Sequence, residues 1–292
     1  MAEAAASLAV RAPRAGWQLW GPRVRRHKGM ILGFCLLGLL VLIALLQDLI
    51  ARESPTRIDV TVALEEPSWV HLMGTDQYGR DVYSRVIHGA RISLTVGLIS
   101  VGIAAIIGTI VGLVAGYYGA AVDALCMRLV DVMLAFPGIL LALAIVSALG
   151  PNLRNLMLAV GIAGIPLYAR IVRGSVLVAK EHLYVEAARA VGAPSRTILV
   201  RHILPNVTAP IVVTATLGMG GAILAAAALS FIGLGSQPPT PEWGRMLSEG
   251  RDYLRDAWWI SAFPGLMIML TVLGMNLLGD GLRDVFDPRL RI

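Results

Sequence analysis

Apolar residues occur in long runs along the chain, and short clusters of charged residues separate these runs instead of alternating with them. Six long stretches contain no Asp, Glu, Lys or Arg, and they span residues 30–47, 92–122, 132–153, 155–169, 203–241 and 257–279. A helix that crosses a bilayer needs about 20 predominantly apolar residues. The pattern therefore predicts an all-α integral membrane protein with six transmembrane helices.

The charged residues that flank these stretches set the limits of the predicted helices. The first predicted helix covers residues 29–50. The other five lie within a predicted transmembrane domain of residues 91–280 and cover residues 92–118, 128–150, 155–175, 208–233 and 258–279. The fourth charge-free stretch is short, but Arg170 and Arg173 can extend toward the headgroups while their stems stay in an apolar layer. Phe136-Pro137 predicts a kink in the third helix.

The first apolar run has a cleaved signal peptide as its alternative interpretation. A signal peptide has an apolar core of roughly 7–15 residues and a small-residue cleavage site. Residues 1–28 make an unusually long leader, the apolar run is longer than such a core, and Leu49-Ile50-Ala51 is the nearest candidate for a cleavage site. We therefore expect the run to stay in the protein as a transmembrane helix.

The basic residues predict the orientation of the chain, because Lys and Arg are enriched in cytoplasmic segments. With the N-terminus placed in the cytoplasm, about two thirds of the 25 Lys and Arg residues fall on the cytoplasmic side. The formal net charge of +6 is then explained by topology better than by nucleic-acid binding, since the positive residues are spread over several segments. The predicted cytoplasmic segments are 1–28, 178–206 and 281–292, and the predicted extracytoplasmic segments are 51–90 and 236–257.

The predicted cytoplasmic loop 178–206 has the pattern of two short helices joined by a turn. Residues 180–191 favour a helix, Gly192 suits a left-handed helix stop, and Ser195 is positioned to cap a second helix that would end at Pro205. A DNA-binding helix-turn-helix is a weak alternative, because the flanking membrane helices would press duplex DNA against the bilayer. Two interpretations remain: a helix that docks on a partner, and a structural linker.

Motifs in this loop resemble a known family. Glu186-Ala187-Ala188, Gly192 and His202-Ile203-Leu204-Pro205-Asn206 resemble the EAA loop of ABC importer permeases. Three further stretches are similar to the C-type permease subunits of dipeptide and oligopeptide importers: Gly74-Thr75-Asp76 with Gly79-Arg80-Asp81, Ser230 to Gly235 with Pro238-Pro239 and Trp243-Gly244, and Asn276 to Asp284 with Asp287 to Leu290. The similarity covers roughly residues 70–292, and Phe286 stands where Leu is usual.

The resemblance implies a type I ABC importer permease fold in the inner membrane of a bacterium. It implies a homologous B-type permease as heterodimer partner, two ATP-binding subunits that hold ATP and Mg²⁺, and an extracytoplasmic substrate-binding protein. Residues expected to couple to the ATPases are Glu186, Ala187, Ala188, Arg189, Val191, Gly192 and Ala193, with His202, Pro205 and Asn206 as support. Residues expected to face the binding protein are Gly74, Thr75, Asp76, Gly79, Arg80, Asp81, Pro238, Pro239, Trp243 and Gly244.

Several other chemistries lack their residues. The two lysines, Lys28 and Lys180, are followed by Gly29 and Glu181, so the chain has no phosphate-binding GxxxxGK[ST] loop and no catalytic or ATP site is expected in it. No metal-ligand spacing occurs, and the cysteines Cys35 and Cys126 are expected to be packing residues. A secondary carrier is a remote alternative because no carboxylate lies mid-span. The sequence also shows no selectivity filter, which a channel would need, and no catalytic pair within the spans, which an intramembrane protease would need. Nickel or glutathione import by the same kind of permease stays open.

Smaller expectations concern packing and charge pairs. Gly108, Gly112 and Gly116 recur every fourth residue and predict a close helix contact, while Gly218, Gly220 and Gly221 are expected to loosen the fifth helix. Charge pairs are expected between Asp81 and Arg85 and between Arg128 and Asp131. Thr75 or Asp76 is expected to cap a short helix that starts at Asp81, and Thr240 a helix that starts at Pro241. Because the predicted spans carry no mid-span charge, peptide recognition is expected to rest mainly on the binding protein.

Overall fold

The computed structural model describes residues 27–286, and within them the chain is helical, with no strand and one isolated β-bridge between Thr75 and Asp81. The predictions about residues 1–26 and 287–292 lie outside the described residues. The helices long and apolar enough to cross a membrane are α2 (Lys28–Leu45), α4 (Val82–Tyr118), α7 (Leu153–Ala179), α10 (Leu204–Phe231, within a continuous helical stretch Ser195–Phe231) and α12 (Trp259–Phe286).

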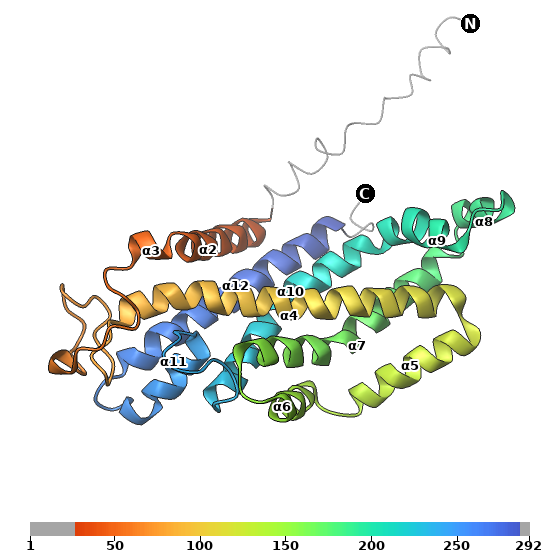
Figure 1. Ribbon diagram of the computed structural model, residues 1–292. Coiled ribbons are helices and arrows are strands. Elements are labelled where there is room, and N and C mark those ends of the chain that lie inside the picture. The colour runs from red at the N-terminus through yellow and green to blue at the C-terminus, as the bar shows by residue number, and fades with distance from the viewer. Residues whose placement is uncertain (1–26, 287–292) are drawn as a thin grey trace, which may run out of the picture.

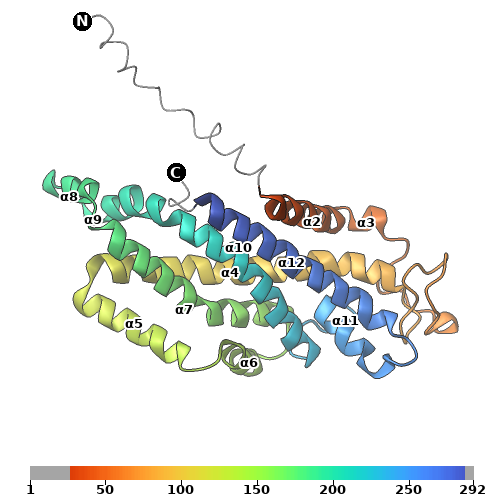
Figure 2. The ribbon, with the colours of Figure 1, turned by 180° about the vertical axis from the view of Figure 1, so that it is seen from behind.

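These helices form an elongated bundle around α4, whose 37 residues run through most of its length (Figure 1). Helices α7, α10 and α12 cross α4, and α2 lies at the edge against α12 and α4. The short helix α3 (Gln47–Ile50), the irregular segment 51–81 and α11 (Trp243–Gly250) gather at one end of the bundle, which we call the α11 end. At the opposite end, the α8 end, the helix α8 (Leu183–Ala190) projects beyond the long helices (Figure 2).

The third predicted transmembrane helix, residues 128–150, is not a single helix in the structure. It is replaced by α5 (Ala120–Leu134) and α6 (Gly138–Leu149), which meet at an angle of 87°. The break falls at Phe136-Pro137, where proline lacks the N–H that would continue α5 and takes the N-cap position of α6 instead. The sequence therefore predicts the position of the break correctly, but it predicts a kink in one helix instead of a sharp bend between two. The reason is that the direction of α6 depends on its tertiary contacts with α7.

Other helix limits also differ from the prediction. The short helix expected at residues 81–87 is the first part of α4, which starts at Val82 without a break before the span. Helix α12 continues to Phe286, so the segment 281–292 begins inside a helix instead of a separate tail. Helix α7 is longer than residues 155–175 at both ends. At its start Asn152 caps the first turn by accepting a hydrogen bond from the Arg154 amide.

The glycine repeat of α4 produces the close helix contact that its spacing predicted. An added Cβ at Gly108 would lie 2.5 Å from Tyr168 Cβ, and one at Gly112 would lie 2.6 Å from the Ala169 carbonyl oxygen. A Cβ at Gly116 would meet Val176 at 2.8 Å. Glycine is thus required along one face of α4 for α7 to pack this closely, as small residues allow for helices in lipid.

Candidate functional site

Helix α8 is anchored to the bundle by one face and leaves the other face open. Val185 and Ala188 are buried and pack against Val176 of α7 and against Ile198 and Ile203. Residues three or four positions apart lie on the same face of a helix. Val185 and Ala188 are three positions apart and therefore form a single apolar contact.

The open side of α8 carries charged and large apolar side chains. Glu186, Ala187 and Arg189 are exposed, and the guanidinium of Arg189 lies 5.4 Å from the centre of the Tyr117 ring. Leu183 and Val191 are 80% and 82% exposed. Apolar residues this exposed on a short anchored helix are typical of a surface that another protein covers.

Helix α8 ends in the left-handed stop that Gly192 predicted. Gly192 has φ +77°, and its N–H donates to the Arg189 carbonyl oxygen over 2.9 Å. The next amide, Ala193 N–H, donates to the Ala188 carbonyl oxygen over 3.0 Å. Together these are the two hydrogen bonds of a Schellman motif, which requires a residue that tolerates positive φ.

The second half of the loop differs from the prediction. Ser195 does not cap a helix through its side chain, and Pro194 occupies the N-cap position instead. The helix does not end at Pro205 either: a short α-helix α9 (Ser195–Thr197) leads into a π-helical segment, Ile198–Ile203, which continues directly into α10. The loop therefore consists of one separate helix, α8, followed by a helical segment that leads directly into α10.

The predicted coupling residues lie together at the α8 end. Among them Ala188 is buried, Ala193 is half-buried, and the exposed ones are Glu186, Ala187, Arg189, Val191 and Gly192. Pro205 and Asn206 are exposed in the first turn of α10, and His202 is half-buried in the turn before it. The structure brings all of these residues onto one short stretch of surface, but it contains no partner, so their coupling role stays a prediction.

A buried network of charges occupies the α11 end. The guanidinium of Arg80 contacts the Asp76 carboxylate and donates to Glu249 Oε2 over 2.8 Å. Arg85 Nη2 donates to the same Glu249 oxygen over 3.0 Å, and Arg85 Nε lies 3.5 Å from Asp76 Oδ2. The side chains of Arg80 and Arg85 are only 3% and 1% exposed. The network thus joins segment 51–81, α4 and α11 at one point.

The turn that contains Asp76 is shaped by two glycines and two hydrogen-bonding side chains. Gly74 and Gly79 have φ of +70° and +69°, and an added Cβ at Gly79 would overlap the Asp59 carbonyl oxygen. Thr75 receives a hydrogen bond from the Glu65 amide, and its carbonyl oxygen accepts one from the Trp259 indole N–H over 3.0 Å. The motif Gly-Thr-Asp-x-x-Gly-Arg therefore describes a rigid turn.

Asp81 plays a different part from the one predicted. Its carboxylate caps α4 by accepting from the Ser84 amide over 2.8 Å, and its other oxygen lies 3.2 Å from His71 Nδ1. It does not pair with Arg85, because capping α4 turns it away from the Asp76–Glu249 network. Thr75 and Asp76 lie before the helix and do not cap it.

Helix α11 is capped by Glu242, not by Thr240, and starts at Trp243. The Glu242 carboxylate accepts from the Gly244 and Arg245 amides, each over 2.9 Å. Burial raises the pKa of Glu242 above its ordinary value, although the backbone amides that donate to it act in the opposite direction. The carboxyl is therefore held by hydrogen bonds from neutral groups, and no ion pair is found for it among the described residues.

Trp243 and Gly244 join α11 to the long helices. The Trp243 indole N–H donates to the Val86 carbonyl oxygen over 3.0 Å, and the ring lies against Gly89 of α4. A Cβ at Gly244 would lie 2.5 Å from Ala227 Cα in α10. Both residues are buried, so they fix the position of α11 against α4 and α10.

The residues predicted to face a binding protein divide into two groups. Pro238 and Pro239 are exposed, whereas the buried ones are Gly74, Thr75, Asp76, Gly79, Arg80, Asp81, Trp243 and Gly244. The buried residues shape this end of the molecule from inside, and docking of a binding protein stays a prediction. Sequence reasoning missed the roles of Glu242 and Glu249, since nothing in the local sequence shows that their carboxylates turn inward.

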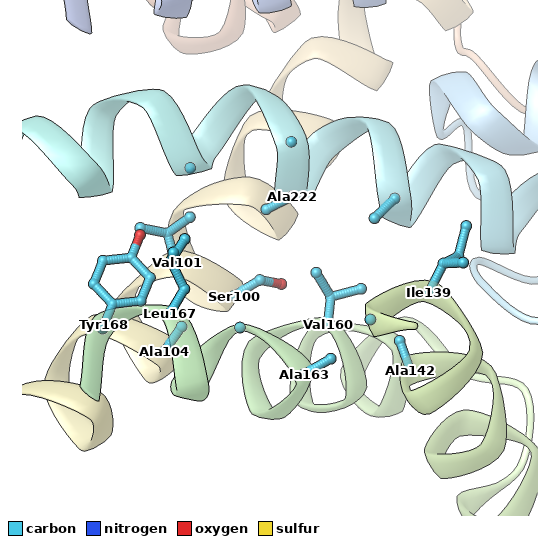
Figure 3. Close-up of a pocket in the computed structure, with 15 residues that line it drawn as sticks. Ser100, Val101, Ala104, Ile139, Ala142, Val160, Ala163, Leu167, Tyr168 and Ala222 are labelled. Carbon is cyan, nitrogen blue, oxygen red and sulfur yellow. The ribbon is translucent and has the colours of Figure 1, made fainter. Parts of the chain in front are cut away.

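An apolar cavity of about 250 Å³ lies between α7 and α10, with α4 behind it and α6 at one end (Figure 3). Small residues such as Ala104, Ala142, Ala163 and Ala222 line most of it. Its hydroxyl groups are engaged within the chain, because Ser100 donates to the Met157 carbonyl oxygen and Tyr168 to that of Thr214. The cavity offers apolar contact and no charge.

Two further expectations about charges and cysteines are wrong. Asp131 pairs with Arg170 of α7 over 2.6 Å instead of with Arg128, and Asp123 pairs with Arg173 of α7, so these ion pairs hold α5 against α7. Cys35 is exposed on α2 instead of packed. Within residues 27–286 no three His, Cys, Asp or Glu side chains are placed to hold a metal ion.

Comparison with known proteins gives one family and several full-length relatives. Residues 108–292 match the family described as binding-protein-dependent transport system inner membrane component. The chain is 46% identical over 275 residues to a dipeptide transport system permease protein of Alkalihalophilus pseudofirmus, covering 94% of this chain and 90% of the relative. It is 47% identical over 271 residues to a di/tripeptide transport system permease protein of Pseudomonas aeruginosa, covering 91% and 89%.

Two other similarities bear on substrate and fold. The chain is 46% identical over 279 residues to a glutathione transport system permease protein of Pectobacterium atrosepticum, covering 95% of this chain and 93% of the relative. Its fold is similar to a chain of the methionine ABC transporter MetNI in inward-facing conformations, with a TM-score of 0.54 at 20% identity, over 69% of this chain and 96% of that chain.

Proposed function

Since the chain belongs to the binding-protein-dependent transport system inner membrane components, and is therefore a multi-pass permease of an ABC importer, we propose that it moves di- and oligopeptides across the cytoplasmic membrane. The observation that supports the substrate best is identity of 46–47% over nearly the whole chain to permeases named for dipeptides and di/tripeptides. An apolar interior cavity without charged lining is compatible with a pathway for substrates of varied side chains.

Energy for transport would come from partner subunits that bind ATP and Mg²⁺, since the sequence lacks a GxxxxGK[ST] loop. Helix α8 is the feature that supports such coupling. Its buried face, Val185 and Ala188, ties it to α7 and to the start of α10, and its open face presents Glu186, Leu183 and Val191 to a partner. A movement of the docked ATPases would reach the bundle through this contact.

The proposed topology has six spans, with α5 and α6 together as the third. Both termini and α8 would lie in the cytoplasm, following the distribution of Lys and Arg, and the α11 end would lie outside. The proposed assembly is a heterodimer with a homologous permease, two ATP-binding subunits and an extracytoplasmic binding protein. Labelling of single cysteines at Thr56 and Glu186, in a chain without Cys35 and Cys126, tests the sidedness with a membrane-impermeant reagent.

Uptake of labelled di- and tripeptides tests the function. The chain is supplied intact, removed, or changed by Glu186→Arg, which reverses the charge on the open face of α8 without touching its buried face. The matched control is Glu181→Arg, an exposed glutamate outside α8. We expect uptake to require the chain, to be lost with Glu186→Arg and to persist with Glu181→Arg. Peptide uptake that continues without the chain contradicts the proposed substrate.

Glutathione import is the second candidate, because the relative from Pectobacterium atrosepticum carries that name at the same level of identity. Glutathione is itself a tripeptide thiol, so the two candidates differ in breadth of substrate more than in chemistry. Competition separates them. Excess dialanine abolishes glutathione uptake if the importer takes peptides generally, and leaves it unchanged if the system is dedicated to glutathione.

A further inference from the structure

The passage from α8 into α10 contains an element that the coupling scheme does not explain. Residues Ile198–Ile203 form a π-helix, in which the Leu204 N–H donates to the Leu199 carbonyl oxygen five residues back. The π-helix is rare, and it is found mostly as single turns inside α-helices, frequently at functional sites. Each such turn holds one residue more than an α-helix would need.

The sequence that follows explains why the π turn stands at this place. Pro205 has no N–H, and in a regular α-helix its ring would collide with the Arg201 carbonyl four residues earlier. The wider π turn allows the chain to pass Pro205 and still continue as a helix. The Asn206 side-chain amide donates to the His202 carbonyl oxygen over 2.6 Å, so the side chain satisfies a carbonyl within the widened turn.

The π turn also packs against α8, together with Val176 of α7. Ile198 and Ile203, at its two ends, are 1% and 0% exposed and pack in the same apolar cluster as Val185 and Ala188. A displacement of α8 therefore acts on the π turn before it reaches α10. Because interiors are close-packed, such a displacement is transmitted to the next element and is not absorbed by compression.

Helix α10 is held at Val207, which is 1% exposed and lies in the same apolar cluster as Ile198 and Ile203, and again from Gly220 onward. None of its residues between Val207 and Gly220 is buried, whereas Ile223, Ala226 and Leu229 are at most 2% exposed. Beside its first turn lies a hollow of about 380 Å³, lined by His182, Tyr184 and Asn206 among others. The stretch of α10 between Val207 and Gly220 is thus less tightly packed than the stretch that follows it.

We propose that Ile198–Ile203 is the joint that converts movement of α8 into movement of α10, with Pro205 and Asn206 as its positioning residues. When the π turn relaxes to α geometry, one residue passes from the turn into the adjoining helix. The segments on the two sides of the joint then rotate relative to each other by roughly 100° and shift by about 1.5 Å along the axis. The helix stays continuous throughout, so the movement reaches the membrane span without a break. This inference rests on the proposed function for its partner but not for its substrate.

Deletion of Val200 is the decisive change. Val200 is 58% exposed and lies in the middle of the π turn, so its removal leaves the residue count of an α-helix. The control Val200→Ala keeps the residue count and removes most of the side chain. In the full importer, reconstituted with its partner permease and ATPases, we expect ATP hydrolysis to persist and peptide imported per ATP to fall by about tenfold with the deletion only.

A second measurement does not depend on the substrate. Amide hydrogen exchange in residues 198–204 is compared without nucleotide and with ATP and vanadate. We expect a nucleotide-dependent change in the intact chain and none after deletion of Val200. Exchange that is the same in both nucleotide states of the intact chain overturns the joint, as does a deletion that imports peptide at the normal ratio to ATP.

Two controls keep the outcomes separate. If the deletion prevents assembly, Pro205→Ala takes its place, because it removes the proline that directly follows the π turn. An unchanged import ratio with Pro205→Ala also overturns the joint. If the intact importer moves no peptide, the proposed substrate fails and hydrogen exchange alone decides whether the joint exists.

Discussion

The guanidinium of Arg85 donates a hydrogen bond to the carboxylate of Glu249 over 3.0 Å, although the two residues are 164 positions apart in the chain. Arg80 shares the same carboxylate oxygen, and Arg245 lies 3.3 Å from the other. One glutamate therefore meets three arginines that belong to the irregular segment, to α4 and to α11. The α11 end of the molecule is held together by this convergence of charges.

Glu249→Gln should strongly destabilise the chain. The substitution keeps the shape of the side chain but leaves Arg80 and Arg85 with Asp76 as their one remaining anionic partner in the network. Breaking a buried ion pair by removing one partner costs about 3–5 kcal/mol. Thermal unfolding in detergent measures the effect, with Glu66→Gln, an exposed glutamate, as the control. Equal midpoints for the two variants would show that the network adds little.

Glu242 should make stability depend on pH in a direction opposite to that of most carboxylates. Because burial raises its pKa, the folded chain holds the proton at pH values where the unfolded chain has already released it. The contribution is fully present below the ordinary value of 4.5 and is lost as the pH rises through the raised pKa of the folded state.

The variant Glu242→Gln isolates this dependence. Glutamine cannot ionise, and its amide oxygen still accepts from a backbone amide at the start of α11. We expect the unfolding midpoint of the intact chain, relative to that of the variant, to fall as the pH rises above 4.5. Parallel curves over that range would mean that the carboxyl of Glu242 ionises as it does in water.

Gly112→Ala should separate α4 from α7. The new methyl group would lie 2.6 Å from the Ala169 carbonyl oxygen and 2.8 Å from Val172 Cβ, which is closer than contact distance. Overpacking of this kind typically costs about 1–3 kcal/mol. Gly102→Ala is the matched control on the same helix, since nothing lies within 4 Å of its added Cβ. The prediction fails if denaturant unfolding finds both variants equally stable.

Gly192→Ala should weaken the attachment of the ATPase subunits. The backbone at Gly192 has φ +77°, and a residue with a Cβ in this region is less stable by roughly 1–2 kcal/mol. The hydrogen bonds that end α8 would then be lost more often, and the open face of α8 would be less well ordered. Titration of ATPase subunits onto the permease pair should show a Kd about tenfold higher. Gly174→Ala, with open space around it inside α7, should leave the Kd unchanged.

The helical fold could be predicted because its main determinant is local in the sequence. Runs such as residues 92–118 contain no charge, and a chain in lipid has few alternatives to a helix there. The left-handed stop at Gly192 and the tight contact at Gly112 were predictable for the same reason, since each depends on a single residue type at a fixed spacing. Both are confirmed in the structure.

The features that escaped prediction depend on partners far away in the chain. Asp131 pairs with Arg170, 39 residues later, and Arg85 pairs with Glu249, 164 residues later, instead of with the nearby residues Arg128 and Asp81. The angle between α5 and α6 is set by packing on α7, which no local pattern records. At the candidate site, position along the chain predicted which residues gather at the α8 end, but not that a π turn joins them to α10.

The span of chain between Arg85 and Glu249 also sets an order of events during biosynthesis. At a synthesis rate of about 5–20 residues per second, roughly ten to thirty seconds pass between the two residues. During this interval α4, α7 and α10 are made one after another, while Arg80 and Arg85 lack the carboxylate that they share in the finished protein. The turn at Asp76 can therefore reach its final form only after α11 has been made, and the α11 end closes late in the synthesis of the chain.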